Sequence, residues 1–188
     1  QHYALFFAVN EYDHPRLSPL QNPIRNAQVI ADILESEYDF ETEVVENPSA
    51  LQWSHWMPTI NECYHGQAYY PHETYRQQLA VDDFTQKQAQ AKLLGGSLLV
   101  AIAADAAGNL IGMSMVTVHS INGRCTAYQG PSGIVTAHRG KGLAIAVKCA
   151  VLEAMLVRFP QVEEVCTEMS VLNKAMAHIN QSIGYTVK

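Results

Sequence analysis

Residues 132–144 read Ser-Gly-Ile-Val-Thr-Ala-His-Arg-Gly-Lys-Gly-Leu-Ala, and this stretch decides the fold class. Its first five residues favour a strand, and the apolar periodicity after the turn predicts a long helix. A strand, a glycine turn and a helix N-terminus together present backbone N–H groups and a positive dipole end, which suit a phosphate. Gly140 and Gly142 let an anion approach closely because they lack a Cβ, and Arg139 and Lys141 add positive charge.

The turn and a later segment carry two ordered motifs of one known family. Residues 139–144, Arg-Gly-Lys-Gly-Leu-Ala, fit the pattern Arg/Gln-x-x-Gly-x-Gly/Ala. Residues 167–185, TEMSVLNKAMAHINQSIGY, are similar to Thr-x-Asn followed by Asn-x-x-Met-x-x-Ile-Asn-x-x-x-Gly-Tyr. Over roughly residues 91–188 the chain therefore resembles the GNAT N-acetyltransferases, whose first motif is the acyl-CoA pyrophosphate loop. Residues 53–90 resemble more loosely the start of two-domain GNAT proteins.

This resemblance implies an α/β fold, with a GNAT-like mixed, mostly antiparallel sheet and flanking helices over residues 53–188. It implies acetyl-CoA as the cosubstrate, with pantetheine paired to a strand edge and the pyrophosphate held in the turn. A backbone N–H near Val135 would serve the thioester carbonyl, and Gly130 would mark a bulge that separates two strands where acetyl-CoA inserts. The cofactor-binding residues expected are Gly133, Ile134, Val135, Arg139, Gly140, Lys141, Gly142, Leu143, Ala144 and Asn173.

The candidate catalytic positions are Glu168 and Asn180, and both depart from the family pattern. Many GNAT enzymes place a tyrosine where this chain has Asn180, and an amide cannot donate a proton to a leaving thiolate. Glu168 stands where the Thr-x-Asn motif has asparagine, and it is the general base that we expect, acting directly or through water. Glu73 is the alternative base, and Tyr185 is expected to pack at the start of a strand.

The first 50 residues form a strand–helix–strand pattern of their own. Strands are expected over residues 3–9 and 40–45, with an amphipathic helix over residues 26–38. This unit resembles the opening of bacterial caspase-like domains. Cysteine catalysis needs a cysteine and a histidine within hydrogen-bond reach, and neither His65 nor Cys125 has the sequence context of that dyad. Residues 1–50 are thus expected as an N-terminal unit, either separate or integrated into the sheet of the following domain.

The remaining elements follow from periodicity and turn residues. Residues 51–72 are expected to form an aromatic loop, and residues 73–94 a helix that ends at Gly95-Gly96. Its expected core residues are Tyr75, Leu79, Val81, Phe84 and Leu93. Strands are expected over residues 97–104, 110–119, 125–129 and 162–166, and the long helix over 141–159 has an apolar stripe of Leu143, Val147, Val151, Ala154 and Met155.

Composition limits the function classes. The chain has 188 residues, 48% of them hydrophobic and 16% charged, which is typical of a globular protein. A net charge of −6 argues against nonspecific nucleic-acid binding and favours a cationic amine as partner. No membrane span, signal peptide or metal-ligand spacing is apparent, so we expect neither a membrane partner nor a metal. Without a Cys-x-x-Cys pair the simplest compartment is the cytoplasm, with Cys149 and Cys166 as buried small side chains.

Three functions remain open from the sequence. The first is an acetyl-CoA-dependent N-acetyltransferase that acts on a small-molecule amine, either as a monomer or as a homodimer. The second is a noncatalytic acyl-CoA-binding or interaction domain, which the asparagine at position 180 favours. The third is a fragment of a caspase-like cysteine peptidase, for which no dyad is evident.

Overall fold

The computed structural model describes residues 40–65, 79–170 and 172–186. The strand and helix expected within residues 3–38, the loop part 66–72, Tyr75 and the alternative base Glu73 lie outside the described residues.

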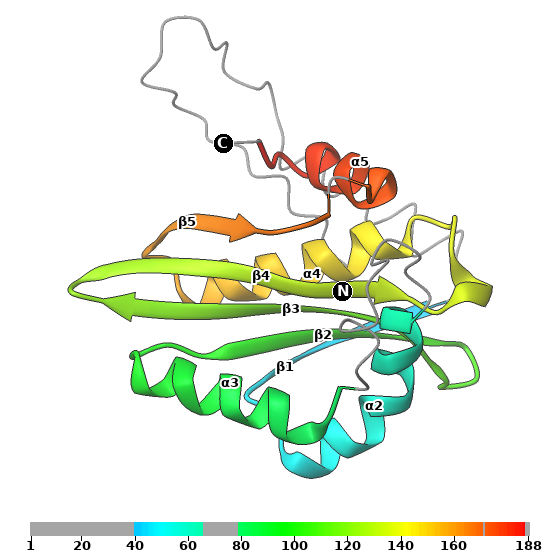
Figure 1. Cartoon of the computed structure of the whole chain (residues 1–188), viewed down its shortest axis with the longest axis horizontal. Helices are drawn as coiled ribbons and strands as arrows, with labels where there is room; N and C mark the ends of the chain where they lie inside the picture. Colours follow the sequence, from blue (N-terminus) through cyan, green and yellow to red (C-terminus); the bar gives the residue numbers. More distant parts are fainter. Residues whose placement is uncertain (1–39, 66–78, 171, 187–188) are drawn as a thin grey trace, which may run out of the picture.

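A five-stranded sheet organises the described part of the chain, in the order β1-β2-β3-β4-β5 (Figure 1). Neighbouring strands are antiparallel from β1 to β4, whereas β4 and β5 are parallel. The strands are β1 (Phe40–Glu46), β2 (Leu98–Asp105), β3 (Leu110–Ile121), β4 (Arg124–Ile134) and β5 (Val162–Thr167). A parallel pair needs a long crossover, and helix α4 (Leu143–Arg158) supplies it. The expected mixed, mostly antiparallel sheet with flanking helices is confirmed.

Tight turns set the strand register. Asn122 and Gly123 join β3 to β4 with φ of 53° and 80°, as a two-residue hairpin requires when both central residues are left-handed. Between β2 and β3, the Asp105 carboxylate accepts from the backbone N–H groups of Ala107 and Asn109, at 3.0 and 2.8 Å. Both turns are encoded locally, which is why the strand boundaries expected here agree with the structure to within two residues.

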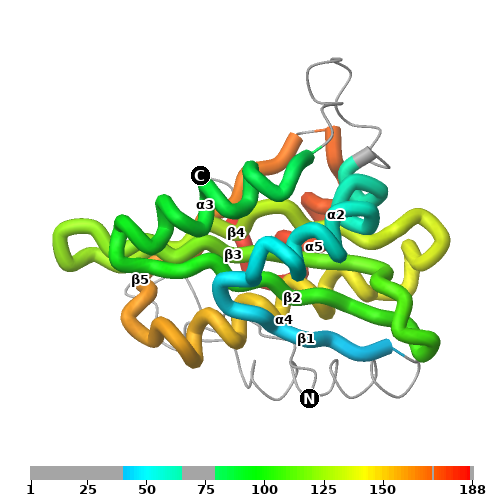
Figure 2. Tube along the Cα trace, turned by 90° about the horizontal axis from the view of Figure 1, so that it is seen from below, coloured from blue at the N-terminus to red at the C-terminus, as the bar shows by residue number. Residues whose placement is uncertain are grey.

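The sheet lies between two helical layers, with α2 (Ala50–His65) and α3 (Val81–Leu93) on one face and α4 on the other (Figure 2). Strand β2 is buried on both faces. Leu98, Val100 and Ile102 pack in the cluster that contains Trp53 and Phe84. The alternate side chains face the cluster formed with α4, and they are Leu99, Ala101 and Ala103. The expected apolar stripe of α4 is confirmed, because Leu143, Val147, Val151 and Met155 are buried and Ala154 packs against them.

Helix α2 replaces the loop expected from residue 51, and that prediction was wrong for residues 51–65. Ser49 and Gln52 form a capping box: the Gln52 Oε1 accepts from the Ser49 N–H at 2.9 Å, and the Ser49 Oγ accepts from the Gln52 N–H at 3.3 Å. Trp53, Trp56 and Ile60 then lie buried at helical spacing. The density of aromatic residues suggested a loop, but the helix continues through Pro58, which lies on its exposed side.

Helix α3 begins at Val81, later than the helix expected from Glu73. Its start is stabilised by the Asp83 carboxylate, whose Oδ2 accepts from the Ala80 N–H at 2.8 Å. Phe84 packs against Trp53 with ring centroids 4.6 Å apart, so α3 joins α2 through stacked aromatic rings. Leu93, an expected core residue, is 87% exposed because it lies in the last turn of α3 on the outer side. The expected stop at the glycine pair is confirmed.

Among the described residues, no helix is both long and apolar enough to cross a membrane.

Candidate functional site

The β4–β5 fork is the point at which these two strands separate. Strand β4 pairs with β5 only as far as Gln129, which lies opposite Thr167. Beyond it, the register with β3 shifts so that Gly130 and Pro131 stand opposite Met115 alone. Figure 1 shows β5 ending beside the middle of β4, after which the chain leads to α5 (Lys174–Ser182). The bulge expected at Gly130 is present, and within the described ranges β4 has no strand partner on its β5 side after residue 129.

The backbone direction along β4 decides which groups face the fork. The Val135 N–H donates to the Ile111 carbonyl of β3 at 2.9 Å, so it points away from the fork. Backbone groups alternate along a strand, and the Gly133 N–H therefore also faces β3, whereas that of Ile134 faces the fork. The Val135 amide itself is therefore not available to a thioester carbonyl, and the amide near Val135 that faces the fork is that of Ile134.

Gly133 also has a packing role. A Cβ at Gly133 would lie 2.8 Å from the Cβ of Cys63 on α2, which is closer than real side chains approach. The glycine therefore allows α2 to lie directly on β4. Burial raises the pKa of the Cys63 thiol to about 12, so this side chain stays a neutral packing group.

The turn between β4 and α4 contains two glycines in the left-handed conformation. After the short 3₁₀-helix η2 (Thr136–His138), Gly140 and Gly142 adopt φ of 79° and 78°, values that side chains rarely tolerate. Nothing lies within 4 Å of the place that a Cβ on Gly140 would occupy, so the left-handed backbone is required there for the shape of the turn. Gly142 is the N-cap of α4 and has no side chain to accept from the N–H groups of Leu143 and Ala144, which have no partner inside the helix.

Positive charge surrounds the turn as the sequence indicated. Arg139 and Lys141 are both exposed beside the two glycines. The Arg139 Nε donates to the Ile134 carbonyl at 2.9 Å, which brings the guanidinium group to the edge of β4 that faces the fork. The turn and the open strand edge are therefore one continuous surface.

Gln129 is buried at the apex of the fork and connects β4 to β5, to α4 and to the segment after α5. Its Oε1 accepts from the Tyr185 hydroxyl at 2.8 Å, and its backbone carbonyl accepts from the Thr167 Oγ1 at 2.9 Å. Its Nε2 donates to the Lys148 carbonyl of α4 at 3.4 Å. Tyr185 thus packs against the core as expected, but it follows α5 outside any strand.

The three predicted residues after β5 have different surroundings. Asn173 caps α5, because its Oδ1 accepts from the Met176 N–H at 3.0 Å, so this oxygen is already used within the protein. Asn180 is 5% exposed, and its Oδ1 has no hydrogen-bond partner among the described residues. Glu168 is exposed directly after Thr167, at the open side of the fork. The structure therefore brings Glu168 to the same end of the sheet as the glycine turn.

The cysteines give no support to peptidase chemistry. Cys125 is buried at the start of β4, and desolvation raises the pKa of its thiol, whereas a nucleophile needs an accessible thiolate. Cys149 is buried as expected, but Cys166 is exposed because β5 is the edge strand of the sheet. Within the described residues, no group of His, Cys, Asp and Glu side chains is arranged to hold a metal ion.

Sequence reasoning missed two residues of the fork, Gln129 and Lys148. Lys148 had a visible signal, since it interrupts the apolar run of α4, where an exposed lysine is not expected. Gln129 had none, because its importance depends on partners such as Tyr185, 56 positions away in sequence.

The comparisons with known proteins agree with this geometry. No protein-family model matches the chain, and no curated protein matches it by sequence. Solved structures do match. A tandem GNAT protein from the clavulanic acid biosynthesis pathway is similar over 78% of this chain and 42% of its own, with a TM-score of 0.58 and 20% identity. An acetyltransferase from Trypanosoma brucei is similar over 80% of this chain and 94% of its own, with a TM-score of 0.55 and 14% identity.

A third solved structure has a bound ligand. An aminoglycoside N-acetyltransferase in complex with CoA is similar over 79% of this chain and 90% of its own, with a TM-score of 0.53 and 15% identity. With only 14–20% identity, these similarities show the fold alone. The chain has the fold of the GNAT acetyltransferases.

Proposed function

We propose that this protein is an acetyl-CoA-dependent N-acetyltransferase that acts on a small-molecule amine. The observation that carries the proposal is the continuous surface made by the open β4 edge and the left-handed glycine turn at the start of α4. One protein of the same fold is an aminoglycoside N-acetyltransferase solved with CoA, which supports both the cosubstrate and the amine.

The residues of the surface fit acetyl-CoA. The backbone N–H groups of residues 140–144 would hold the pyrophosphate, since a helix N-terminus with glycines is a ready anion site. The Ile134 N–H would pair with pantetheine, and Arg139 would add charge at the same edge. The unpartnered Asn180 Oδ1 is a buried acceptor that a pantetheine N–H would satisfy. Asn173 keeps its amide nitrogen for the CoA arm while its oxygen caps α5.

The chemistry requires a base for the amine and a site for the acceptor. Glu168 lies exposed at the open side of the fork, where a carboxylate can take a proton from an incoming ammonium group directly or through water. The net charge of −6 favours a cationic acceptor over an anionic one.

Calorimetry with acetyl-CoA tests the cosubstrate, and the chain offers a matched control. Gly140 and Gly123 have φ of 79° and 80°, and at both positions the space that a Cβ would take has no atom within 4 Å. Gly140→Val and Gly123→Val should therefore lose similar stability, about 1–2 kcal/mol for a side chain in the left-handed region. Only Gly140→Val should lose acetyl-CoA binding. Equal binding by both variants would contradict the placement of the pyrophosphate.

Thiol release against a panel of amines then separates the enzyme from a noncatalytic acyl-CoA-binding domain. Turnover with any amine, reduced in Glu168→Gln, supports the enzyme and its base. Binding of acetyl-CoA without thiol release for any amine would favour the noncatalytic binding domain. Asn180 motivates this alternative, because it stands where many GNAT enzymes have a tyrosine.

A further inference from the structure

Lys148 is a buried cation that the proposed function does not yet use. It is 1% exposed, in the middle of α4, and its neighbours in the helix are apolar. Among the residues that the structure describes, no carboxylate lies within ion-pair distance of its ammonium group. Burying an ammonium group without a counter-ion costs free energy, and an apolar residue of the same length would fill the space without that cost. A role beyond packing is therefore expected.

The position of Lys148 connects it to the fork. Its carbonyl accepts from the Gln129 Nε2 at 3.4 Å, and Gln129 is the last β4 residue paired with β5. Its Nζ lies 5.7 Å from the centroid of the Tyr185 ring, whose hydroxyl donates to the Gln129 Oε1. The ammonium group therefore lies beside the Tyr185 ring, which is hydrogen-bonded to the residue at which the two strands separate.

Within the described ranges, the titratable groups that face Lys148 do not supply a negative charge. Cys149 on α4 and Tyr185 after α5 are the titratable groups beside it, and Cys166 on β5 lies near Tyr185. Burial raises the pKa of Tyr185, so its phenol stays protonated at neutral pH. Burial lowers the pKa of Lys148 to about 8, which leaves the side chain charged at pH 7 and neutral in alkali.

We propose that Lys148 is the counter-charge for the thiolate that leaves when the acyl group is transferred at the fork. The inference rests on the proposed function. The amine nitrogen attacks the thioester carbon, its proton passes to the base, and the C–S bond breaks with its electron pair remaining on sulfur. The ammonium group stabilises that negative charge through the low-dielectric interior, and no proton leaves Lys148.

The direct test is the titration of CoA bound to the protein, followed by the ultraviolet absorbance of its thiolate, in wild type and in Lys148→Met. We expect the thiol pKa of bound CoA to be lower in wild type, by about one unit or a tenfold change in the thiolate ratio. Lys148→Arg should keep the wild-type value, because arginine stays charged. The same thiol pKa in wild type and Lys148→Met would overturn the proposal.

Thermal unfolding and kinetics distinguish this role from a structural one. Lys148→Met should unfold at a higher temperature than wild type, because it removes an unpaired buried charge, and yet show about tenfold lower kcat with little change in KM for acetyl-CoA. The kcat of wild type should fall above about pH 8, and Lys148→Arg should lack this alkaline decrease. A lower unfolding temperature together with unchanged kcat in Lys148→Met would show a structural role. Failure of wild type to bind CoA would instead refute the proposed function.

Discussion

At the scale of single residues, two buried asparagines differ in whether the described residues satisfy their polar atoms. Asn61 is satisfied within the protein: its Oδ1 accepts from the Leu79 N–H at 2.9 Å, and its Nδ2 donates to the Leu79 carbonyl at 3.2 Å. This pair of bonds joins α2 to the start of α3. Asn180 is equally buried, but its Oδ1 has no partner among the described residues. A buried polar atom without a partner costs stability, and under the proposed function a pantetheine N–H would satisfy it.

The two asparagines respond differently to replacement by leucine. Asn61→Leu should lose about 1–3 kcal/mol of unfolding free energy, because it leaves the Leu79 backbone groups unsatisfied. Asn180→Leu should leave stability unchanged or raise it slightly, yet weaken acetyl-CoA binding. Chemical denaturation and calorimetry on both variants make the comparison. An Asn180→Leu variant that binds acetyl-CoA as wild type does would exclude the amide from the CoA site.

At the scale of elements, α2 and α4 begin in different ways. Helix α2 starts at the Ser49–Gln52 capping box, which satisfies N–H groups at its first turn. Helix α4 starts at Gly142, which leaves such groups for a ligand. Under the proposed function, the start of α2 stabilises the fold and the start of α4 binds the pyrophosphate.

Removing the cap should cost α2 part of its stability. Ser49→Ala should lower the unfolding free energy by about 1 kcal/mol, since the serine oxygen that accepts from the Gln52 N–H is lost. Ser54→Ala is the matched control, because Ser54 is exposed within the same helix and its hydroxyl donates to the Ala50 carbonyl. Denaturant titration should show little change for the control. Equal losses in both variants would mean that the capping box is not what stabilises the helix.

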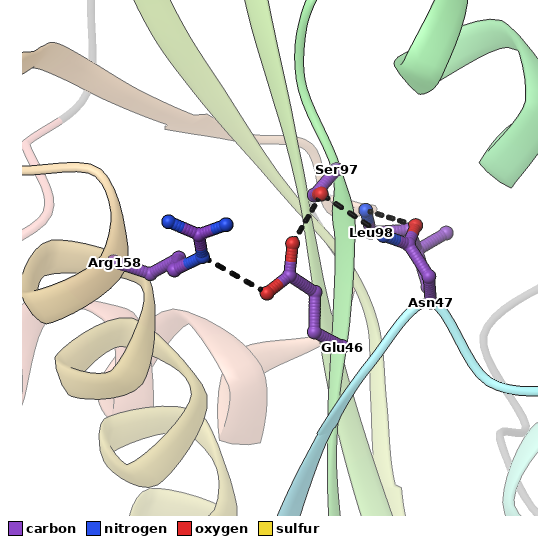
Figure 3. A network of polar contacts seen from close by, with 5 residues as sticks. All are labelled: Glu46, Asn47, Ser97, Leu98 and Arg158. Atoms are coloured by element: carbon purple, nitrogen blue, oxygen red, sulfur yellow. Dashed lines mark hydrogen bonds and ion pairs between the residues drawn. The ribbon is translucent and has the colours of Figure 1, made fainter.

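At the scale of the whole molecule, a polar network joins three elements at the end opposite the glycine turn (Figure 3). The Glu46 carboxylate of β1 accepts from the Ser97 hydroxyl and, at 3.1 Å, from the Arg158 Nε of α4. Asn47 donates to the Ser97 Oγ at 3.0 Å and accepts from the Leu98 N–H at 3.4 Å. The network holds β1 and α4 to the start of β2, so the strand at the end of the N-terminal 50 residues is part of the same sheet.

The contribution of this network to the unfolding free energy should depend on pH. The hydrogen bond from Ser97 and the neighbouring Arg158 hold the pKa of Glu46 below its usual value of 4.5. A carboxyl whose pKa is lowered by folding adds stability above its unfolded pKa, and this stability is lost as the pH falls through the folded pKa. The difference in unfolding free energy between wild type and Glu46→Gln should therefore shrink below pH 4.5. A difference that stays constant as the pH falls would contradict this role of the network.

Much of the fold was predictable because its signals are local. The strands from residue 97 to 134, the Asn-Gly hairpin and the long helix depend on periodicity and turn residues a few positions apart. The same holds for the glycine turn of the candidate site. Residues 51–65 were wrongly assigned to an aromatic loop, because tertiary packing of the tryptophans against the sheet decided the helix.

The sequence by itself determined the strand–turn–helix at residues 132–144, including the left-handed glycines and the charges beside them. The tertiary structure alone decided the direction of the Val135 amide, the exposure of Cys166 and the burial of Lys148 beside Gln129 and Tyr185. The physical reason is distance along the chain. A turn is fixed by the backbone preferences of adjacent residues, whereas the burial and hydrogen bonding of a polar side chain depend on which distant elements come to cover it.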